Sequence, residues 1–250
     1  MTLTKKLILL FVLCFLILIK IGFSTLIEVG VSEDIGSKII SETSNANFNV
    51  VKFSTEFYNI GSVPYSTRER IFVYNDSDLL FSGWSQEKNF MSGDKKTFDI
   101  YWYASSLGNY TYKLKFYFGN EINESETKEF QVRDALIPED VFEMSSFRTY
   151  DDHVIFDLKS KSNAQNVIII PYKYTPGWIF EQKTIDSMKN NTVKTISLPY
   201  SPTVWEPATL KLLIVSNNGK YYSEKTVEMK KETGIVAFFY YIWDNLKLIL

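Results

Sequence analysis

The sequence is poor in cysteine and histidine, with one of each in 250 residues. Because Cys14 has no second cysteine to pair with, an intramolecular disulfide is excluded, and so is a zinc site built from cysteine and histidine ligands. No G-x-S-x-G nucleophile motif occurs, and His153 follows two aspartates in a predicted turn before a strand. We therefore predict a protein that is not an enzyme and that has no metal or cofactor.

A surplus of either charge is also missing. Lysine and arginine number 27 against 29 acidic residues, so the formal net charge is -2. No basic stripe stands out that would bind nucleic acid. The acidic clusters at 76–78, 121–126 and 151–152 lack the ligand spacing of a defined calcium loop, and we interpret them as solvated turns.

Aromatic residues, by contrast, are abundant at 16%, with 19 Phe and 16 Tyr. Such a composition favours strands over helices. From about residue 47 apolar and polar residues alternate, as in half-buried strands, for example over 49–59, 96–103 and 110–118. Because Gly, Asn, Asp and Ser clusters separate these segments, the pattern predicts an antiparallel β-sandwich.

The second half of the chain repeats this pattern. Residues 95–102 align with 193–200, and 112–121 with 210–219, both at an offset of 98 residues. We interpret the repeat as a tandem duplication of a domain of roughly 100 residues, an ordinary size for a sandwich. The predicted domains are 28–134 and 135–231, flanked by an N-terminal segment over 1–27 and a C-terminal helix over 232–250.

The first predicted domain also carries a family resemblance. The stretch "EFYNIGSVPYS", a Gly-Asp turn before "FDIYW", and "GNYTYKL" resemble the CARDB and NEW3 type of immunoglobulin-like domain of archaeal and bacterial cell-surface proteins, including S-layer-associated ones. The second domain resembles it more loosely, since it has "VWEPATL" where the Gly-x-Tyr entry is expected. The resemblance implies an all-β fold of two tandem immunoglobulin-like sandwiches, an envelope or adhesion role, and no catalytic residues.

The N-terminal segment predicts export. After two lysines an apolar run extends from Leu7 to Ile19 and continues beyond one further lysine. This pattern is typical of a cleaved signal peptide, whereas an uncleaved segment ending at Ile27 approaches the ~20 residues that span a bilayer as a signal anchor. Both alternatives place the remaining chain outside the cytoplasm.

Four N-x-S/T sequons agree with export. They begin at Asn75, Asn109, Asn123 and Asn190, all in predicted turns where a glycan would be accommodated. An exported protein without disulfides has to obtain its stability from core burial.

The C-terminal segment "GIVAFFYYIWDNLKLIL" mixes apolar residues with Asp244 and Lys247. Its apolar residues follow helical spacing, and the two charged residues lie together on another face. We predict an amphipathic helix on the outer leaflet or on a membrane partner, with a full span and core packing as alternatives. The expected membrane contacts are Phe238, Phe239, Ile242, Trp243 and Leu246.

Two aromatic groups are candidate contacts with partners or glycans. The first group surrounds a Pro-Gly turn, where its rings would either stack on sugars or begin a core strand. The second group would either form an exposed patch or pack against the neighbouring sandwich. The groups are Tyr172, Tyr174 and Trp178, and Tyr101, Tyr103 and Tyr117.

These features predict a non-enzymatic, membrane-anchored, extracytoplasmic cell-surface protein with a structural or protein-docking role. Its expected partners are the membrane and envelope or membrane proteins, and not nucleic acid. Two alternatives remain open: a module that binds surface glycans through the Trp178 loop, and an accessory subunit of a membrane protein complex.

Overall fold

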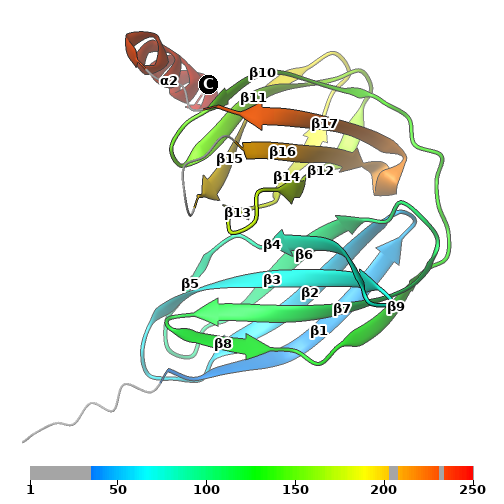
Figure 1. Cartoon of the computed structure of the whole chain (residues 1–250), viewed down its shortest axis with the longest axis vertical. Coiled ribbons are helices and arrows are strands. Elements are labelled where there is room, and N and C mark those ends of the chain that lie inside the picture. Colours follow the sequence, from blue (N-terminus) through cyan, green and yellow to red (C-terminus); the bar gives the residue numbers. More distant parts are fainter. Residues whose placement is uncertain (1–34, 203–207, 231–233, 250) are drawn as a thin grey trace, which may run out of the picture. The chain divides into compact units, whose positions relative to one another are not determined.

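The computed structural model describes residues 35–202, 208–230 and 234–249. The chain divides into two units, 1–33 and 34–250, and the described elements all belong to the second. The predicted signal segment over 1–27 lies outside the described residues. Within them the fold is almost entirely antiparallel β-structure, as the alternation predicted (Figure 1).

The first sandwich consists of nine strands: β1 (Ser37–Asn47), β2 (Val50–Asn59), β3 (Tyr65–Asn75), β4 (Asp78–Trp84), β5 (Lys88–Phe90), β6 (Lys95–Tyr103), β7 (Gly108–Phe118), β8 (Glu121–Glu124) and β9 (Lys128–Val132). One sheet has the order β1-β2-β6 and the other β4-β3-β7-β8. Strand β5 pairs with β3, and β9 pairs with β7.

The second sandwich consists of eight strands: β10 (Phe142–Thr149), β11 (His153–Ser160), β12 (Ala164–Tyr174), β13 (Ile179–Phe180), β14 (Lys183–Met188), β15 (Val193–Ser201), β16 (Ala208–Ser216) and β17 (Tyr221–Met229). Its sheets have the orders β10-β11-β15-β13 and β14-β12-β16-β17. A short 3-10 turn, η1 (Asn217–Gly219), joins β16 to β17, and helix α2 (Gly234–Ile249) follows.

The segments that align at an offset of 98 residues occupy equivalent places. Strands β6 and β15 each pair with the second strand of their sandwich, and β7 and β16 each pair with the third. The register differs by two residues, because Val51 lies opposite Trp102 whereas Val154 lies opposite Leu198 rather than Tyr200. A shift of two keeps each side chain on its face of the sheet, whereas a shift of one would turn it over.

The core of the first sandwich is largely aromatic. Phe57 lies at its centre, with its ring stacked on Phe116 at a centroid distance of 4.7 Å. Phe53 packs on Tyr112 at 4.8 Å. The second core is mainly aliphatic, with Leu, Ile and Val from β11, β12 and β16. Alternate residues of each strand enter these cores, as their period of two requires.

Strand β12 contains a proline in its interior. Pro171 is buried and lies opposite Leu212, and the strand continues to Tyr174. The register shifts between Pro171 and Lys173, so a bulge follows the proline. Proline occurs at bulges because it cannot donate to the hydrogen-bond ladder.

Glu69 places a carboxyl group inside the first core. It lies on β3 with 1% of its surface exposed, and its Oε1 accepts a hydrogen bond from Thr55 Oγ1 at 3.0 Å. Its Oε2 has no partner among the described residues. Burial raises the pKa of Glu69 well above its ordinary value, although the hydrogen bond from Thr55 opposes the shift. Folding therefore favours the neutral acid.

We expect Glu69→Gln to remove a pH dependence of stability. Since the pKa of Glu69 is raised on folding, its contribution is fully present below the ordinary pKa and is lost as the pH rises through the raised pKa. The free energy of unfolding of the variant should exceed that of the wild type by a margin that grows by up to about 1.4 kcal/mol per pH unit over this range. Urea unfolding across pH measures it. The control is Glu56→Gln on β2, and parallel wild-type and Glu69→Gln curves would contradict the prediction.

Candidate functional site

Helix α2 packs on the second sandwich, where it contacts β15. Its 16 residues span about 24 Å at 1.5 Å per residue. Lys247 lies in the last turn, where a cation interacts favourably with the helix dipole. No helix in the described part of the chain is long and apolar enough to cross a membrane.

Asp244 attaches this helix to strand β10. Its side chain is 0% exposed, and both of its oxygens accept hydrogen bonds from the Arg148 guanidinium, with Arg148 Nε 2.5 Å from Oδ2. The Tyr150 hydroxyl donates a further bond to Oδ2 at 2.8 Å. The bond to Asp244 raises the pKa of Arg148, and burial together with Asp244 raises the pKa of Tyr150. Such a bidentate charged pair fixes orientation as well as position.

Aromatic contacts surround this ion pair. The Tyr241 ring lies 5.4 Å from that of Tyr150 and 6.2 Å from that of His153, centroid to centroid. His153 begins β11 directly after the acidic turn, as predicted from the sequence. A second ion pair joins Lys247 to Asp157 at 3.6 Å. The helix is thus held through its polar side.

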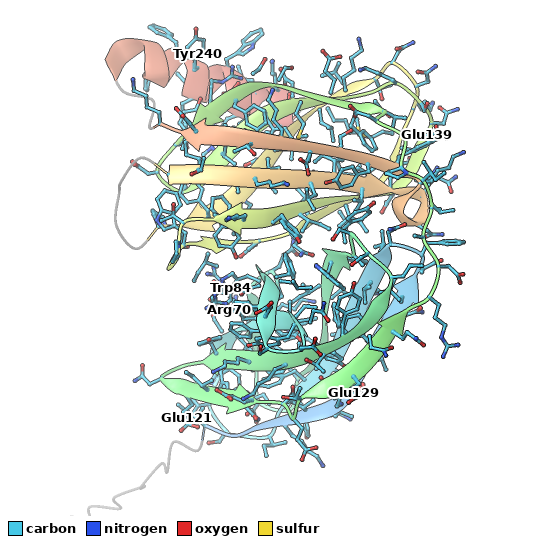
Figure 2. All side chains as sticks on the ribbon, turned by 45° about the vertical axis from the view of Figure 1, so that its right-hand side comes forward. Arg70, Trp84, Glu121, Glu129, Glu139 and Tyr240 are labelled. Atoms are coloured by element: carbon cyan, nitrogen blue, oxygen red, sulfur yellow. The ribbon has the colours of Figure 1, made fainter. Side chains whose placement is uncertain are left out.

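The apolar side chains of α2 point away from the sandwich. The five predicted membrane contacts are between 42% and 64% exposed, and Tyr240, whose ring lies under the Arg148 guanidinium, is also exposed (Figure 2). This arrangement is the reverse of an ordinary surface helix, which turns its apolar face to the core. The five residues are Phe238, Phe239, Ile242, Trp243 and Leu246, and we name them the apolar face of α2.

Of the two alternatives for the Pro-Gly turn, core packing describes Trp178, which does not lie on the surface and belongs to the second core. It is 3% exposed, and its ring is stacked on Tyr200 at 5.2 Å with an interplanar angle of 2°.

Tyr172 faces the first sandwich, where its ring is stacked on Phe81 of β4 at 5.6 Å. Tyr174 packs against the core of the second sandwich, with its ring 5.0 Å from that of Phe180, while its hydroxyl donates a hydrogen bond to Ser82 O of the first sandwich at 3.4 Å. Burial raises the pKa of Tyr174 to about 12.

The predicted tyrosine patch is likewise not an exposed surface. Tyr103 is buried, with its ring 4.7 Å from that of Tyr222 on β17. Tyr117 is half-buried beside Trp84, at 5.1 Å. The alternative that these tyrosines pack against the neighbouring sandwich is correct for Tyr103. Tyr101 contacts the second sandwich through its backbone.

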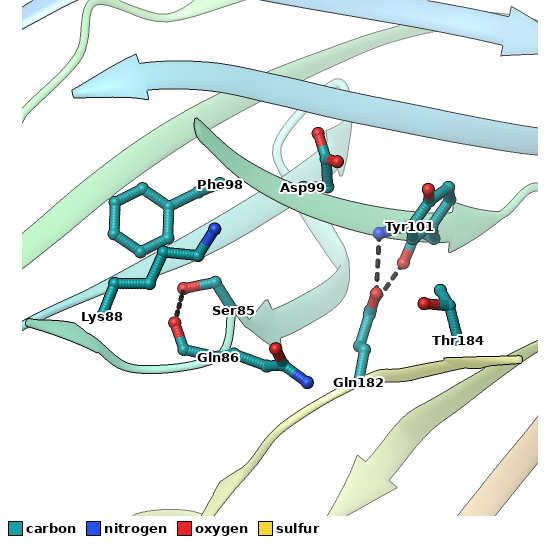
Figure 3. Close-up of a pocket in the computed structure, with 8 residues that line it drawn as sticks. All are labelled: Ser85, Gln86, Lys88, Phe98, Asp99, Tyr101, Gln182 and Thr184. Carbon is teal, nitrogen blue, oxygen red and sulfur yellow. Dashed lines mark hydrogen bonds between the residues drawn. The ribbon is translucent and has the colours of Figure 1, made fainter. Parts of the chain in front are cut away.

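Gln182 makes that backbone contact. Its Oε1 accepts a hydrogen bond from Tyr101 N, and its Nε2 donates one to Tyr101 O, both at 2.7 Å (Figure 3). The Arg70 guanidinium stacks on Trp84 at 4.9 Å (Figure 2), and Arg68 pairs with Glu181 at 3.4 Å. Below these polar contacts four residues of the second sandwich join the core of the first: Ile168, Ile170, Leu213 and Val215.

The sequons lie in different settings. Asn75 ends β3 at a turn and Asn190 lies in a turn, as predicted. Asn109 and Asn123 lie instead within strands β7 and β8, which corrects the prediction of a turn at these positions. Asn123 is half-buried and donates a hydrogen bond to Ser37 Oγ at 3.2 Å. The side chains of the other three are exposed.

Two chemical possibilities are absent from the described residues. They contain no group of three His, Cys, Asp or Glu side chains that could hold a metal ion. The one histidine contacts Asp152, Tyr150 and Tyr241 and has no nucleophile among its contacts.

No family model matches the sequence, and no curated protein matches it. Solved structures with some similarity include red sea bream transglutaminase, with a TM-score of 0.27 and 8% identity over 80% of this chain and 31% of that one. Latent dimeric PorU from Porphyromonas gingivalis has a TM-score of 0.32 and 15% identity over 82% and 21%. The fibronectin(III)-like modules of Clostridium thermocellum CbhA have a TM-score of 0.24 and 10% identity over 79% and 94%.

The chain thus spans about a third of the transglutaminase chain and about a fifth of the PorU chain. With such low TM-scores, none of these similarities carries an activity, substrate or partner over to this chain.

Proposed function

We propose that this chain is a non-enzymatic, extracytoplasmic, membrane-attached protein of the cell surface with a structural or protein-docking role in the envelope. The supporting observation is the apolar face of α2, which stays exposed while the buried Asp244 holds the other side of the helix. Exposed apolar surface of this kind marks contact with a membrane or a protein. Phe, Tyr and Trp on one helix suit the membrane–water interface.

The finer fold assignment belongs to the same proposal. We assign both sandwiches to the immunoglobulin-like class, as tandem copies over 28–134 and 135–231. The support is the strand order, since a sheet containing the first, second and sixth strands faces a second sheet in the first sandwich, and β10-β11-β15 repeats this arrangement in the second. The junction at Gln182 would hold the copies together as a stiff spacer.

An accessory subunit of a membrane protein complex is the second candidate. The same observation favours it, because the apolar face of α2 would fit a groove on a partner protein as well as a lipid surface. The two candidates differ in whether lipid alone binds the helix.

We expect residues 35–250 to bind vesicles of phosphatidylcholine and phosphatidylglycerol through this face. The double variant Phe239→Asp/Trp243→Asp should lower the fraction that sediments with vesicles at least about tenfold, because a charge costs several kcal/mol on leaving water. The matched control is Leu79→Asp/Ile122→Asp, which changes two residues with similar exposure on the first sandwich. It should bind like the wild type.

Loss of membrane proteins from a detergent pull-down with Phe239→Asp/Trp243→Asp, without any vesicle binding by the wild type, would favour the accessory subunit. A full-length chain that fractionates with the cytosol would contradict both candidates.

A further inference from the structure

A polar groove along the junction of the two sandwiches plays no part in the proposed function. It consists of two clefts that share Tyr101 and Thr184. The larger cleft has a volume of about 400 Å³ and the smaller one about 160 Å³. Figure 3 shows the smaller cleft, with Tyr101 and Thr184 on one side and Lys88 and Phe98 on the other.

Side-chain amides dominate the polar lining of the larger cleft. Asn45 and Asn47 come from β1, Asn166 from β12, and Asn218 from the turn η1. None of the four makes a side-chain hydrogen bond to another described residue. Each amide offers two donors and one acceptor, which is the mixture that hydroxyl groups require.

Ser216 contributes a buried polar group to the wall of the larger cleft. It lines the same cleft, is 1% exposed, and its Oγ has no hydrogen-bond partner among the described residues. A buried hydroxyl without a partner is unfavourable, and each such group in a folded protein calls for an explanation. Because this oxygen is already buried without a ligand, the exposed side chains beside it, such as Thr184, are the ones within reach of a ligand.

The formal charges along the groove cancel. Lys52 pairs with Asp99 at 3.0 Å, and Lys88 and Asp186 contribute one further charge of each sign. A neutral ligand is therefore favoured, because neither cleft carries a surplus of charge that would attract an anion or a cation. This charge balance decides between neutral and acidic ligands of the same size.

Apolar side chains lie beside the amides. Val50 and Ile168 line the larger cleft, and Tyr101 lines both clefts. Binding sites combine such apolar surface with a few placed polar groups. Sugar rings present the matching combination, with C–H faces for apolar contact and hydroxyls at the rim.

We propose that this groove binds a neutral oligosaccharide that contacts both sandwiches at once. The amides of Asn45 and Asn47 would bind its hydroxyls from the first sandwich, and the Thr184 hydroxyl would do so from the second. The two clefts adjoin at Tyr101 and Thr184, which suits an elongated ligand rather than a single compact one.

The test uses the full-length chain in an amine-oxide detergent, because alkyl glycoside detergents would compete for the site. An array of neutral and acidic oligosaccharides identifies a ligand, and calorimetric titration measures its Kd. We expect Asn45→Ala/Asn47→Ala and Thr184→Val each to raise the Kd about tenfold or more, as loss of a ligand hydrogen bond does. The control Asn75→Ala/Asn190→Ala changes exposed asparagines outside the groove and should leave the Kd unchanged.

Thermal unfolding of every variant shows whether it folds. Because the two groove variants lie in different sandwiches, one remains informative if the other is unstable. Absence of neutral ligands on the array, a preference for acidic glycans, or an unchanged Kd in both groove variants would overturn the proposal.

Discussion

We expect Asp244→Ala to release helix α2 from the second sandwich. Asp244 accepts three hydrogen bonds while fully buried, two from Arg148 and one from Tyr150. Removing one partner of a buried ion pair costs about 3–5 kcal/mol, because the other charge is left without compensation. When the helix undocks, water reaches Arg148 and its charge is no longer buried. The decrease in the free energy of unfolding therefore cannot exceed the free energy with which the helix docks on the sandwich.

Hydrogen exchange of the α2 amides measures this release. Protection over 238–248 should fall in Asp244→Ala towards that of a free helix, while protection in β11 and β15 should change little. The control Lys247→Ala removes the more exposed pair with Asp157 and should cost less than about 1 kcal/mol.

A double-mutant cycle with Arg148→Ala tests the pairing itself. If the two side chains act as one pair, the double variant should be no less stable than Asp244→Ala alone. Full protection of α2 in Asp244→Ala would show that other contacts hold the helix, and would remove the basis for its fixed outward face.

Phe57→Ala should destabilise the protein by about 3–5 kcal/mol, as does the loss of a fully buried aromatic ring. Phe57 is 0% exposed, and its ring lies 4.7 Å from Phe116, 5.5 Å from Phe90 and 5.8 Å from Phe118. Phe57 lies on β2, which is paired with β1 and β6, and Phe116 and Phe118 lie on β7, which is paired with β3 and β8, so these strands cannot collapse onto the cavity.

Urea unfolding followed by circular dichroism measures the loss. Leu107→Ala, at an exposed position of the same sandwich, should stay within about 0.5 kcal/mol of the wild type. Because Ile168 and Ile170 of β12 belong to the first core, we expect one transition that shifts as a whole. A wild-type curve with two separate transitions, only one of which shifts, would contradict a shared core.

The strands over 49–59, 96–103 and 110–118 were predictable because their signal is local. Val51, Phe53 and Phe57 are separated by even numbers of residues, which places them on one face of the strand whatever the partner strand is. The helix at the C-terminus followed from spacing in the same way. The attachment of this helix did not, since Arg148 and Asp244 are 96 residues apart and nothing in a single sequence pairs them.

The contact between the two sandwiches had a signal in the sequence, but a search for alternating apolar and polar residues does not detect it. Residues 167–171 of β12 are apolar at every position, so both faces of the strand are buried, one in each core. Trp178 was ambiguous for a different reason, because an aromatic residue after a Pro-Gly turn is equally suited to a surface or to a core. The burial of Glu69 could not be predicted, because a single glutamate in a strand is normally expected to face solvent.

The outward position of Trp243 also makes its fluorescence distinguishable from that of the buried tryptophans. Of the four indoles that the structure describes, Trp84, Trp102 and Trp178 are buried and Trp243 is 59% exposed. A collisional quencher dissolved in water therefore reaches the Trp243 side chain before the other three. The fluorescence lifetime of Trp243 reports on the surroundings of α2, while the emission of Trp84, Trp102 and Trp178 reports on the interiors of the two sandwiches.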